Sequence, residues 1–149
     1  MANEVRLQMK SVLQITLVKV NVSDHGFLYE LLKKRDPRTN ISHRMMPTYQ
    51  EHVKFVKSKP YKVWYVIHLS DVRIGSIYLS KQNEIGIFLL KEYQGKNIGQ
   101  HALEILMRMH PEKRYLANVN PKNRKSASFF KKNNFKLIQH TYELIPSKM

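Results

Sequence analysis

Cysteine is absent from this chain of 149 residues, and glycine (5) and proline (6) are scarce. Without cysteine, disulfide bridges, thiolate catalysis and cysteine-ligated zinc are excluded, and the absence fits a cytoplasmic location. Because 42% of the residues are hydrophobic, the chain has the composition of a folded protein and not of a disordered one. Its length favours a single domain, which we expect to span residues 1–149.

Acidic residues are also few, 11 against 26 lysines and arginines, so the net charge is +15. This charge attracts anions such as phosphates, nucleotides and nucleic acids, and it repels polycationic substrates such as polyamines at long range. For most individual lysines, a role in solubility alone explains the charge equally well.

Long apolar runs are missing as well. No stretch approaches the roughly 20 consecutive apolar residues that a transmembrane helix needs. The apolar patch near the N-terminus is interrupted by Gln14, Thr16 and Lys19 and has no small-residue cleavage site. It therefore predicts a strand over residues 12–20 and not a signal peptide, and we expect no membrane partner.

The apolar residues that are present predict an α+β fold in the order β-α-α-β-β-β-α-β-α-β. Thr48 and Glu51 form a T-x-x-E capping box, which marks the start of the second helix. Three closely spaced apolar runs in the middle of the chain indicate an antiparallel meander. The expected strands are residues 12–20, 62–69, 74–80, 84–90, 114–119 and 135–145, and the expected helices begin near residues 25, 49, 97 and 123.

A basic turn with two glycines, KEYQGKNIGQ, connects the predicted strand 84–90 to the next predicted helix. Backbone N–H groups and the helix dipole make such a helix N-terminus a binding site for anions. Gly95 and Gly99 would let a ligand approach the backbone closely, and Lys96 adds positive charge. The turn matches neither GxxxxGK[ST] nor GxGxxG, so taken alone it is explained equally well as a purely structural turn.

This turn resembles the cofactor loop of the GNAT superfamily of acyl-CoA-dependent N-acyltransferases, which follows Gln/Arg-x-x-Gly-x-Gly/Ala. Gln94 and Gly99 match the first and last positions of that motif, and Asn97 replaces its middle glycine. The replacement is mild, because asparagine is the non-glycine residue that best tolerates a positive φ.

A second block, NPKNRKSASFFKKNNFK, resembles the C-terminal helix pattern of the same family, N-x-x-S-x-x-x-Y-x-x-x-G-F. Asn123, Ser126 and Phe135 match, whereas Phe130 replaces the tyrosine and Asn134 replaces the glycine. Asn134 remains a suitable left-handed helix stop. Together with the order of elements between the two blocks, the resemblance covers residues 12–145.

The resemblance implies the GNAT fold: a mixed, mostly antiparallel sheet of about six to seven strands, splayed at its middle and flanked by about four helices. It also implies that acetyl-CoA lies between strands 84–90 and 114–119. Backbone N–H groups near Leu89 would bind the pantetheine, those of residues 95–100 the pyrophosphate, and Asn123 the pantetheine arm. The cofactor-binding residues implied in this way are Phe88, Leu89, Leu90, Gln94, Gly95, Lys96, Asn97, Ile98, Gly99, Gln100, Asn123, Ser126 and Phe130.

The implied reaction is transfer of an acetyl group to a primary amine by direct attack in a ternary complex. The amine must be neutral to attack, so a base matters, and our candidate is Glu84 at the start of the strand beside the thioester. The alternative is that Glu84 is a solvated turn residue. Phe130 cannot donate a proton to the leaving thiolate, so Ser126 or water would do so; alternatively, Phe130 marks a weak or inactive member.

The region before the meander sets acceptor choice in this superfamily. Its candidate acceptor-binding residues are Arg35, Arg38, His43, Arg44 and His52. Guanidinium groups bind phosphate and carboxylate bidentately, which slightly favours an amino-sugar nucleotide over a protein N-terminus or a lysine. Each of the two histidines is also explained by a surface or packing role. The seven histidines show no metal-site spacing such as HExxH, so we expect no metal.

Two functions of other classes stay open at this point. A basic nucleic-acid-binding module would explain the +15 charge and the lysines around Phe129 and Phe130, although no RNA-recognition signature is present and we expect no specific nucleic acid. A non-catalytic CoA-binding protein would explain Phe130. Monomer and homodimer are equally compatible with the sequence.

Overall fold

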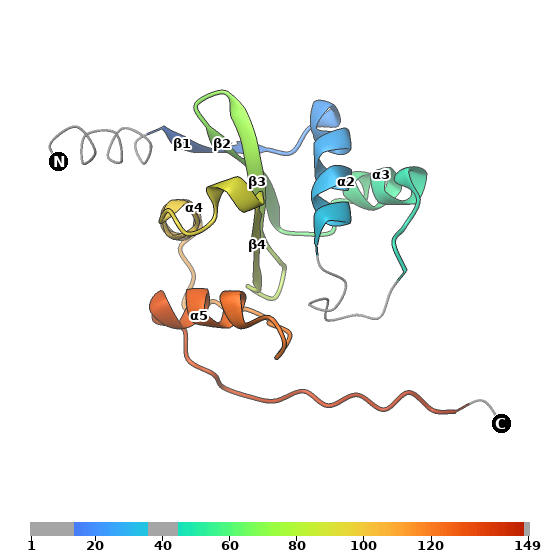
Figure 1. Ribbon diagram of the computed structural model, residues 1–149, viewed down its shortest axis with the longest axis vertical. Helices are drawn as coiled ribbons and strands as arrows, with labels where there is room; N and C mark the ends of the chain where they lie inside the picture. The colour runs from blue at the N-terminus through green and yellow to red at the C-terminus, as the bar shows by residue number, and fades with distance from the viewer. Residues whose placement is uncertain (1–13, 36–44, 148–149) are drawn as a thin grey trace, which may run out of the picture.

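A four-stranded antiparallel sheet in the order β1-β2-β3-β4 organises this protein (Figure 1). The computed structural model describes residues 14–35 and 45–147. The strands are β1 (Ile15–Lys19), β2 (Val63–Leu69), β3 (Val72–Leu79) and β4 (Ile85–Leu89). The helices are α2 (His25–Lys34), α3 (Tyr49–Lys57), α4 (Ile98–Met109) and α5 (Arg124–Lys132), with short 3-10 turns η1 (Val22–Asp24) and η3 (Lys91–Tyr93).

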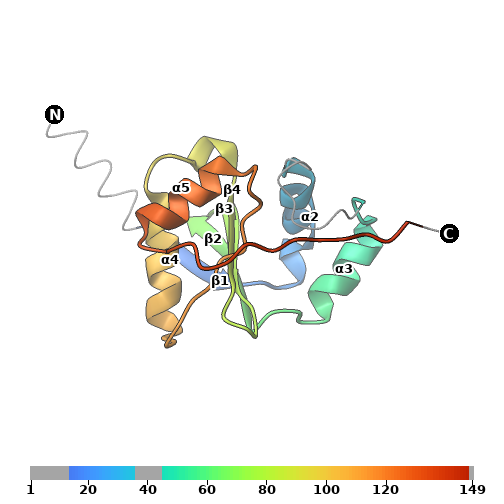
Figure 2. The ribbon, with the colours of Figure 1, turned by 90° about the horizontal axis from the view of Figure 1, so that it is seen from below.

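The sheet lies between two layers of helices, with α2 and α3 on one face and α4 and α5 on the other (Figure 2). Strand side chains alternate between faces, so neighbouring residues join different cores. Ile67 belongs to the larger apolar cluster with Leu103 and Leu106 of α4, whereas Val66 belongs to a smaller cluster with Leu28 of α2. The α+β architecture and the four flanking helices are therefore as predicted.

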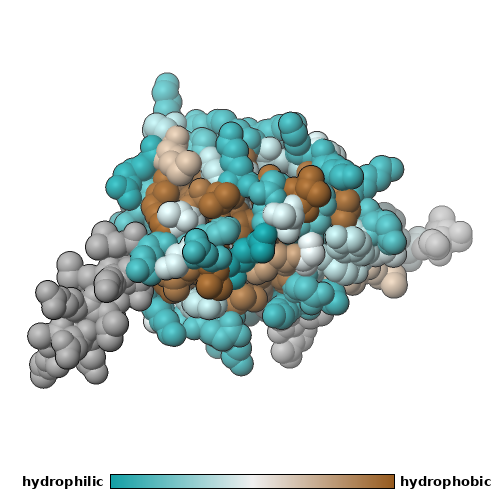
Figure 3. All heavy atoms as spheres, turned by 90° about the horizontal axis from the view of Figure 1, so that it is seen from above, coloured by the Kyte–Doolittle hydropathy of each residue, from teal (hydrophilic) through white to brown (hydrophobic). Residues whose placement is uncertain are grey.

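Hydrophilic side chains form the rim of the molecule seen from above, and apolar side chains gather in the middle of that view (Figure 3). None of the helices in residues 14–35 and 45–147 has the length and hydrophobicity of a transmembrane segment.

The predicted capping box at the start of α3 is present. The Glu51 N–H donates to Thr48 Oγ1 at 3.2 Å, and the Thr48 N–H donates to Glu51 Oε1 at 3.0 Å. This reciprocal pair satisfies two backbone donors that the first turn of a helix leaves unpaired.

Two predicted strands are not formed, so the described part of the sheet has four strands and not six to seven. Residues 114–119 make one isolated parallel bridge, between Glu84 and Leu116, and then leave β4. Residues 135–145 have no regular structure and expose apolar side chains such as Leu137 and Tyr142. Both segments carry strand-like sequences, but residues 114–119 diverge from β4 after one bridge, and residues 135–145 pair with no strand among the described residues.

The end of α5 is fixed by a Schellman motif centred on Asn134, which has a φ of 71°. The Phe135 N–H donates to the Phe130 carbonyl at 2.9 Å, and the Asn134 N–H donates to the Lys131 carbonyl at 3.0 Å. The Phe130 and Phe135 rings pack with centroids 5.1 Å apart, which is the apolar contact that accompanies this motif. The predicted left-handed helix stop at Asn134 is confirmed.

Replacing Asn134 with alanine should destabilise the protein, because the left-handed backbone conformation at this position is sterically less favourable for alanine than for asparagine. We expect a loss of about 1 kcal/mol and a fall in Tm of roughly 2–4 °C, measured by circular dichroism. Asn134→Gly is the matched control and should be at least as stable as the native chain. Equal Tm values for the alanine and glycine variants would contradict the role of this conformation.

Candidate active site

The outer edge of β4 is open along most of its length. On the side away from β3, the Ile85 N–H donates to the Leu116 carbonyl at 2.7 Å. Backbone groups of successive strand residues alternate in direction, so the N–H groups of Ile87 and Leu89 face the same side as that of Ile85. Beyond the bridge to Leu116, no described segment pairs with this edge. Ile87 and Leu89 therefore present unpaired backbone donors.

The family resemblance implied that these donors lie around Phe88, Leu89 and Leu90. The register of β4 against β3 changes that set. Phe88 lies opposite Ser76, and its N–H faces β3. The Leu90 N–H donates to the Ile74 carbonyl at 2.9 Å, so it is already paired. Leu89 stays in the set, and Ile87 joins it. Ile87 is identified by the alternating direction of backbone N–H groups along β4. This alternation assigns a direction to each residue only when the pairing with β3 is known.

The turn after β4 leads directly from this edge to the first turn of α4. Gln94 Nε2 donates to the Leu89 carbonyl at 2.9 Å and ties the turn to the end of the strand. Gly95 has a φ of 75°, and a Cβ atom there would meet nothing within 4 Å. Asn97 precedes α4 with a φ of 63°, the left-handed conformation predicted for it.

The N-terminus of α4 has no side-chain cap, unlike those of α3 and α5. The first intrahelical bond runs from the His101 N–H to the Asn97 carbonyl, at 3.2 Å. The N–H groups of Ile98, Gly99 and Gln100 precede it and lack intrahelical acceptors. These donors, the helix dipole and the neighbouring Lys96 form an arrangement suited to an anion.

Gly99 serves packing between elements. A Cβ atom at this position would lie 3.1 Å from Phe129 Cε2 of α5 and 3.5 Å from Leu89 Cδ1 of β4. The absence of a side chain therefore lets the first turn of α4 approach both elements. Of the two glycines in the turn, Gly95 is the one with open space beside it.

The first turn of α5 is organised by Asn123, whose Oδ1 accepts from the Ser126 N–H at 3.1 Å. The Asn123 oxygen is thus committed to capping the first turn of α5. Ser126 is half-buried. Phe130 is buried and packs edge-on against Phe129, with centroids 5.1 Å apart.

Glu84 is half-buried and is hydrogen-bonded at both carboxylate oxygens. The Ser80 hydroxyl donates to Oε1 at 3.1 Å, and the Asn118 side-chain amide donates to Oε2. Ser80 is itself buried and accepts from the Glu84 N–H at 2.9 Å. Sequence reasoning missed Ser80 and Asn118, because neither belongs to a motif and Asn118 is 34 residues from Glu84.

Comparison with known protein families identifies the family to which this chain belongs. The family model described as Acetyltransferase (GNAT) domain matches residues 14–136. The chain belongs to the GNAT acetyltransferase family. Comparison with curated protein sequences finds no match.

Solved structures share the GNAT fold of this chain at low sequence identity. A domain from Methanocaldococcus jannaschii is 21% identical with a TM-score of 0.74, and the match covers 87% of this chain and 92% of that one. RimL, a ribosomal L7/L12 alpha-N-protein acetyltransferase in complex with coenzyme A, is 18% identical with a TM-score of 0.66, covering 85% and 82%. Spermidine N-acetyltransferase from Vibrio cholerae is 18% identical with a TM-score of 0.67, covering 89% and 85%.

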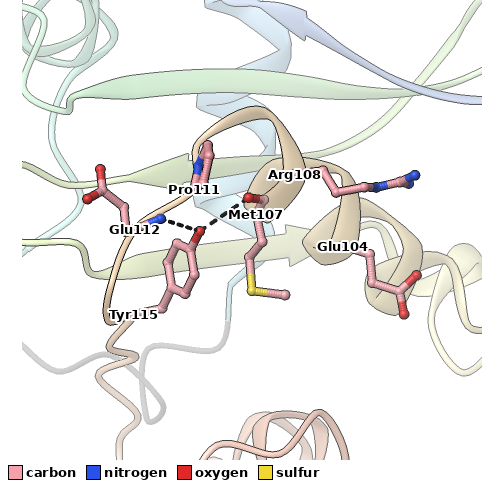
Figure 4. A pocket seen from close by; sticks show the side chains of 6 residues that line it. All are labelled: Glu104, Met107, Arg108, Pro111, Glu112 and Tyr115. Carbon is pink, nitrogen blue, oxygen red and sulfur yellow. Dashed lines mark hydrogen bonds between the residues drawn. The ribbon is translucent and has the colours of Figure 1, made fainter.

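Two hollows among the described residues of this GNAT domain lie away from the β4 edge. One, of about 480 Å³, is formed at the C-terminal end of α4, where the Tyr115 hydroxyl bonds the backbone of Glu112 and Met107 (Figure 4). This is the opposite end of α4 from Asn97. Another, of about 470 Å³, lies beside β1, which is the opposite edge of the sheet from β4.

Of the predicted acceptor-binding residues, Arg35 and His52 lie within the described structure, whereas Arg38, His43 and Arg44 lie outside the described residues. Arg35 is exposed at the end of α2, where its charge acts on the Tyr61 and Tyr78 hydroxyls. Arg35 thus lies on the α2–α3 side of the sheet.

His52 is a core residue of the α2–α3 layer. Its ring is buried, 5.6 Å from the Tyr29 ring and 6.4 Å from the Phe55 ring, and its Nδ1 has no hydrogen-bond partner among the described residues. Burial lowers the pKa of His52 below its ordinary value, and the neighbouring His25 acts in the same direction. The structure therefore favours the packing role over a role as a base.

The lowered pKa of His52 predicts a loss of stability in acid. Between the folded pKa and the unfolded value of about 6.5, the unfolded chain binds more protons, so stability falls as the pH drops below about 6.5. His52→Leu removes this titration and should show a smaller fall in the free energy of unfolding between pH 7 and pH 5, measured by urea denaturation. An identical pH dependence for both proteins would contradict this assignment.

Proposed function

We propose that this GNAT-family chain is an acetyl-CoA-dependent N-acetyltransferase that acts on a primary amine. The observation that carries the proposal is the continuity of unpaired backbone donors from the open edge of β4 into the uncapped N-terminus of α4. Gln94 holds these two parts together through the Leu89 carbonyl. A strand edge suits the amide groups of a pantetheine, and a helix N-terminus suits a pyrophosphate.

The residues present fit acetyl-CoA. The N–H groups of Ile87 and Leu89 would hold the pantetheine and polarise the thioester carbonyl. Those of Gly95 to Gln100, with Lys96, would hold the pyrophosphate, and Asn123, Ser126 and Phe130 would line the arm from α5. When bound, acetyl-CoA would supply the acetyl group as a thioester for direct attack by a neutral amine in a ternary complex.

In this proposal, Glu84 is the base that removes the proton of the amine. Its carboxylate lies beside the point where residues 114–119 leave β4, and Ser80 and Asn118 fix its orientation. Most amines are protonated at neutral pH, so a positioned base raises the fraction that reacts. Because Phe130 has no hydroxyl, water or Ser126 would protonate the departing thiolate.

The acceptor that we favour is an amino-sugar nucleotide, because a guanidinium such as that of Arg35 pairs well with a diphosphate. A protein N-terminus or a lysine is the second candidate. The net charge of +15 disfavours polycationic amines. A nucleotide amino sugar, a peptide with a free N-terminus and spermidine therefore form a discriminating set of acceptors.

Glu84→Gln should lower kcat/KM for the best acceptor of that set by roughly 100- to 10,000-fold at neutral pH. The deficit should shrink as the pH approaches the pKa of the amine, because the acceptor then loses its proton without help. Release of CoA can be followed with a thiol reagent without background from the protein, which contains no cysteine.

Glu30→Gln, at an exposed glutamate paired with Lys33 on α2, is the matched control and should keep full activity. Full activity in Glu84→Gln would contradict the role of Glu84. Turnover of the peptide without turnover of any nucleotide amino sugar would contradict the preferred acceptor.

A further inference from the structure

The side chain of Tyr78 on β3 packs over Gly86 of the neighbouring strand β4, where the absence of a side chain leaves room for the ring. The register places Tyr78 opposite Gly86. A Cβ atom on Gly86 would come within 2.2 Å of the Tyr78 ring atoms Cε1 and Cζ and within 2.5 Å of the hydroxyl oxygen. The hydroxyl end of the ring therefore rests on the backbone of β4, the strand whose outer edge is open.

Tyr61 fixes this ring from the connection between α3 and β2. The rings of Tyr61 and Tyr78 are stacked in parallel, with centroids 3.8 Å apart and an interplanar angle of 2°. Tyr61 is in turn held by Trp64, whose ring packs edge-on at 4.9 Å. Both tyrosines are half-buried, and burial raises the pKa of each, so each stays a neutral phenol at physiological pH.

The Tyr78 hydroxyl lies on the same face of the sheet as Glu84. Ile85 belongs to the apolar cluster under α4, so by alternation Glu84 and Gly86 lie on the α2–α3 face, where the Tyr78 ring also lies. The charges of both Arg35 and Glu84 act on the Tyr78 hydroxyl. Tyr78 thus lies within electrostatic range of both the proposed base and the proposed anion-binding arginine.

The attacking amine needs a second hydrogen-bond acceptor besides the base. A neutral primary amine has two N–H groups and one lone pair, and the lone pair must face the thioester. Glu84 can accept one hydrogen, directly or through water. The second hydrogen needs another acceptor on the same face, and a phenol oxygen can accept as well as donate.

We propose that Tyr78 contacts the acceptor amine, with its hydroxyl oxygen accepting the second N–H, and that Tyr61 is the positioning residue that holds Tyr78 over Gly86. This inference rests on the proposed function, because it assumes that the thioester lies at the open edge of β4. It adds a residue that contacts the acceptor and that no sequence motif of this chain contains.

A bisubstrate probe tests the proposal without knowledge of the natural acceptor. The probe is carboxymethyl-CoA coupled to propylamine. Its amide nitrogen stands in for the attacking amine after loss of one hydrogen to Glu84, and it keeps the single N–H that Tyr78 would accept. Its affinity is compared with that of CoA by calorimetry. The native protein should bind the probe more tightly than CoA. Tyr78→Phe should lose roughly fivefold to tenfold of affinity for the probe and keep its affinity for CoA.

Four further variants, one of them a control, distinguish the position of the Tyr78 hydroxyl from a general loss of folding. Gly86→Ala keeps the hydroxyl but displaces the ring, and it should lose affinity for the probe as Tyr78→Phe does. Tyr61→Ala should lose it too, whereas Tyr61→Phe, which preserves the stacked ring, should retain most of it. Tyr142→Phe, at a tyrosine 90% exposed near the C-terminus, is the matched control and should bind both molecules normally.

The outcomes are distinguishable from failure of the proposed function. If the native protein binds CoA but gains nothing from the propylamide arm, or if Tyr78→Phe or Gly86→Ala binds the probe normally, the proposal for Tyr78 is overturned. If neither CoA nor the probe binds the native protein, the proposed function fails and the inference falls with it.

Discussion

The separation of β4 from residues 114–119 after a single bridge is the constraint on which the candidate site depends. At that bridge, the Ile85 N–H donates to the Leu116 carbonyl and the Leu116 N–H donates to the Asn83 carbonyl. Further contact would pair the edge of β4 and leave no backbone donors for a ligand. The same departure brings Asn118 back to the Glu84 carboxylate. One geometric feature thus creates the open edge and orients the proposed base beside it.

The elements beyond this edge are fixed by close packing and by left-handed residues. Asn97 turns the chain into α4, Gly99 lets α4 approach Phe129, and Asn134 closes α5 through the Phe130–Phe135 contact. Phe130 therefore has a structural role that a phenylalanine fulfils completely. The phenol hydroxyl that we propose to contact the acceptor comes instead from Tyr78, on the α2–α3 face of the sheet.

Local features of this chain were predictable from sequence, and features that depend on partner strands were not. The capping box at Thr48 and the left-handed Asn97 and Asn134 follow from local side-chain chemistry, and all three are present. Residues 114–119 and 135–145 have strand-like composition, but a ladder needs a partner in register, and the sequence alone does not fix that register. Ile87 could not be identified from sequence for the same reason, because the direction of its N–H group depends on the pairing of β4 with β3. Sequence reasoning also missed Ser80, Asn118 and the Tyr61–Tyr78 stack, which join distant parts of the chain.

The central claim is that the β4 edge and the first turn of α4 together bind CoA, and thermal unfolding with added ligand tests it most directly. At about 100 times the dissociation constant, CoA and acetyl-CoA should each add ~2.7 kcal/mol of stability. For a chain of this size that corresponds to a rise in Tm of roughly 5–11 °C, and ATP at the same concentration should give a smaller rise. An equal rise with ATP would mean that the protein binds polyanions through its net charge alone. No rise with either form of CoA would contradict the account.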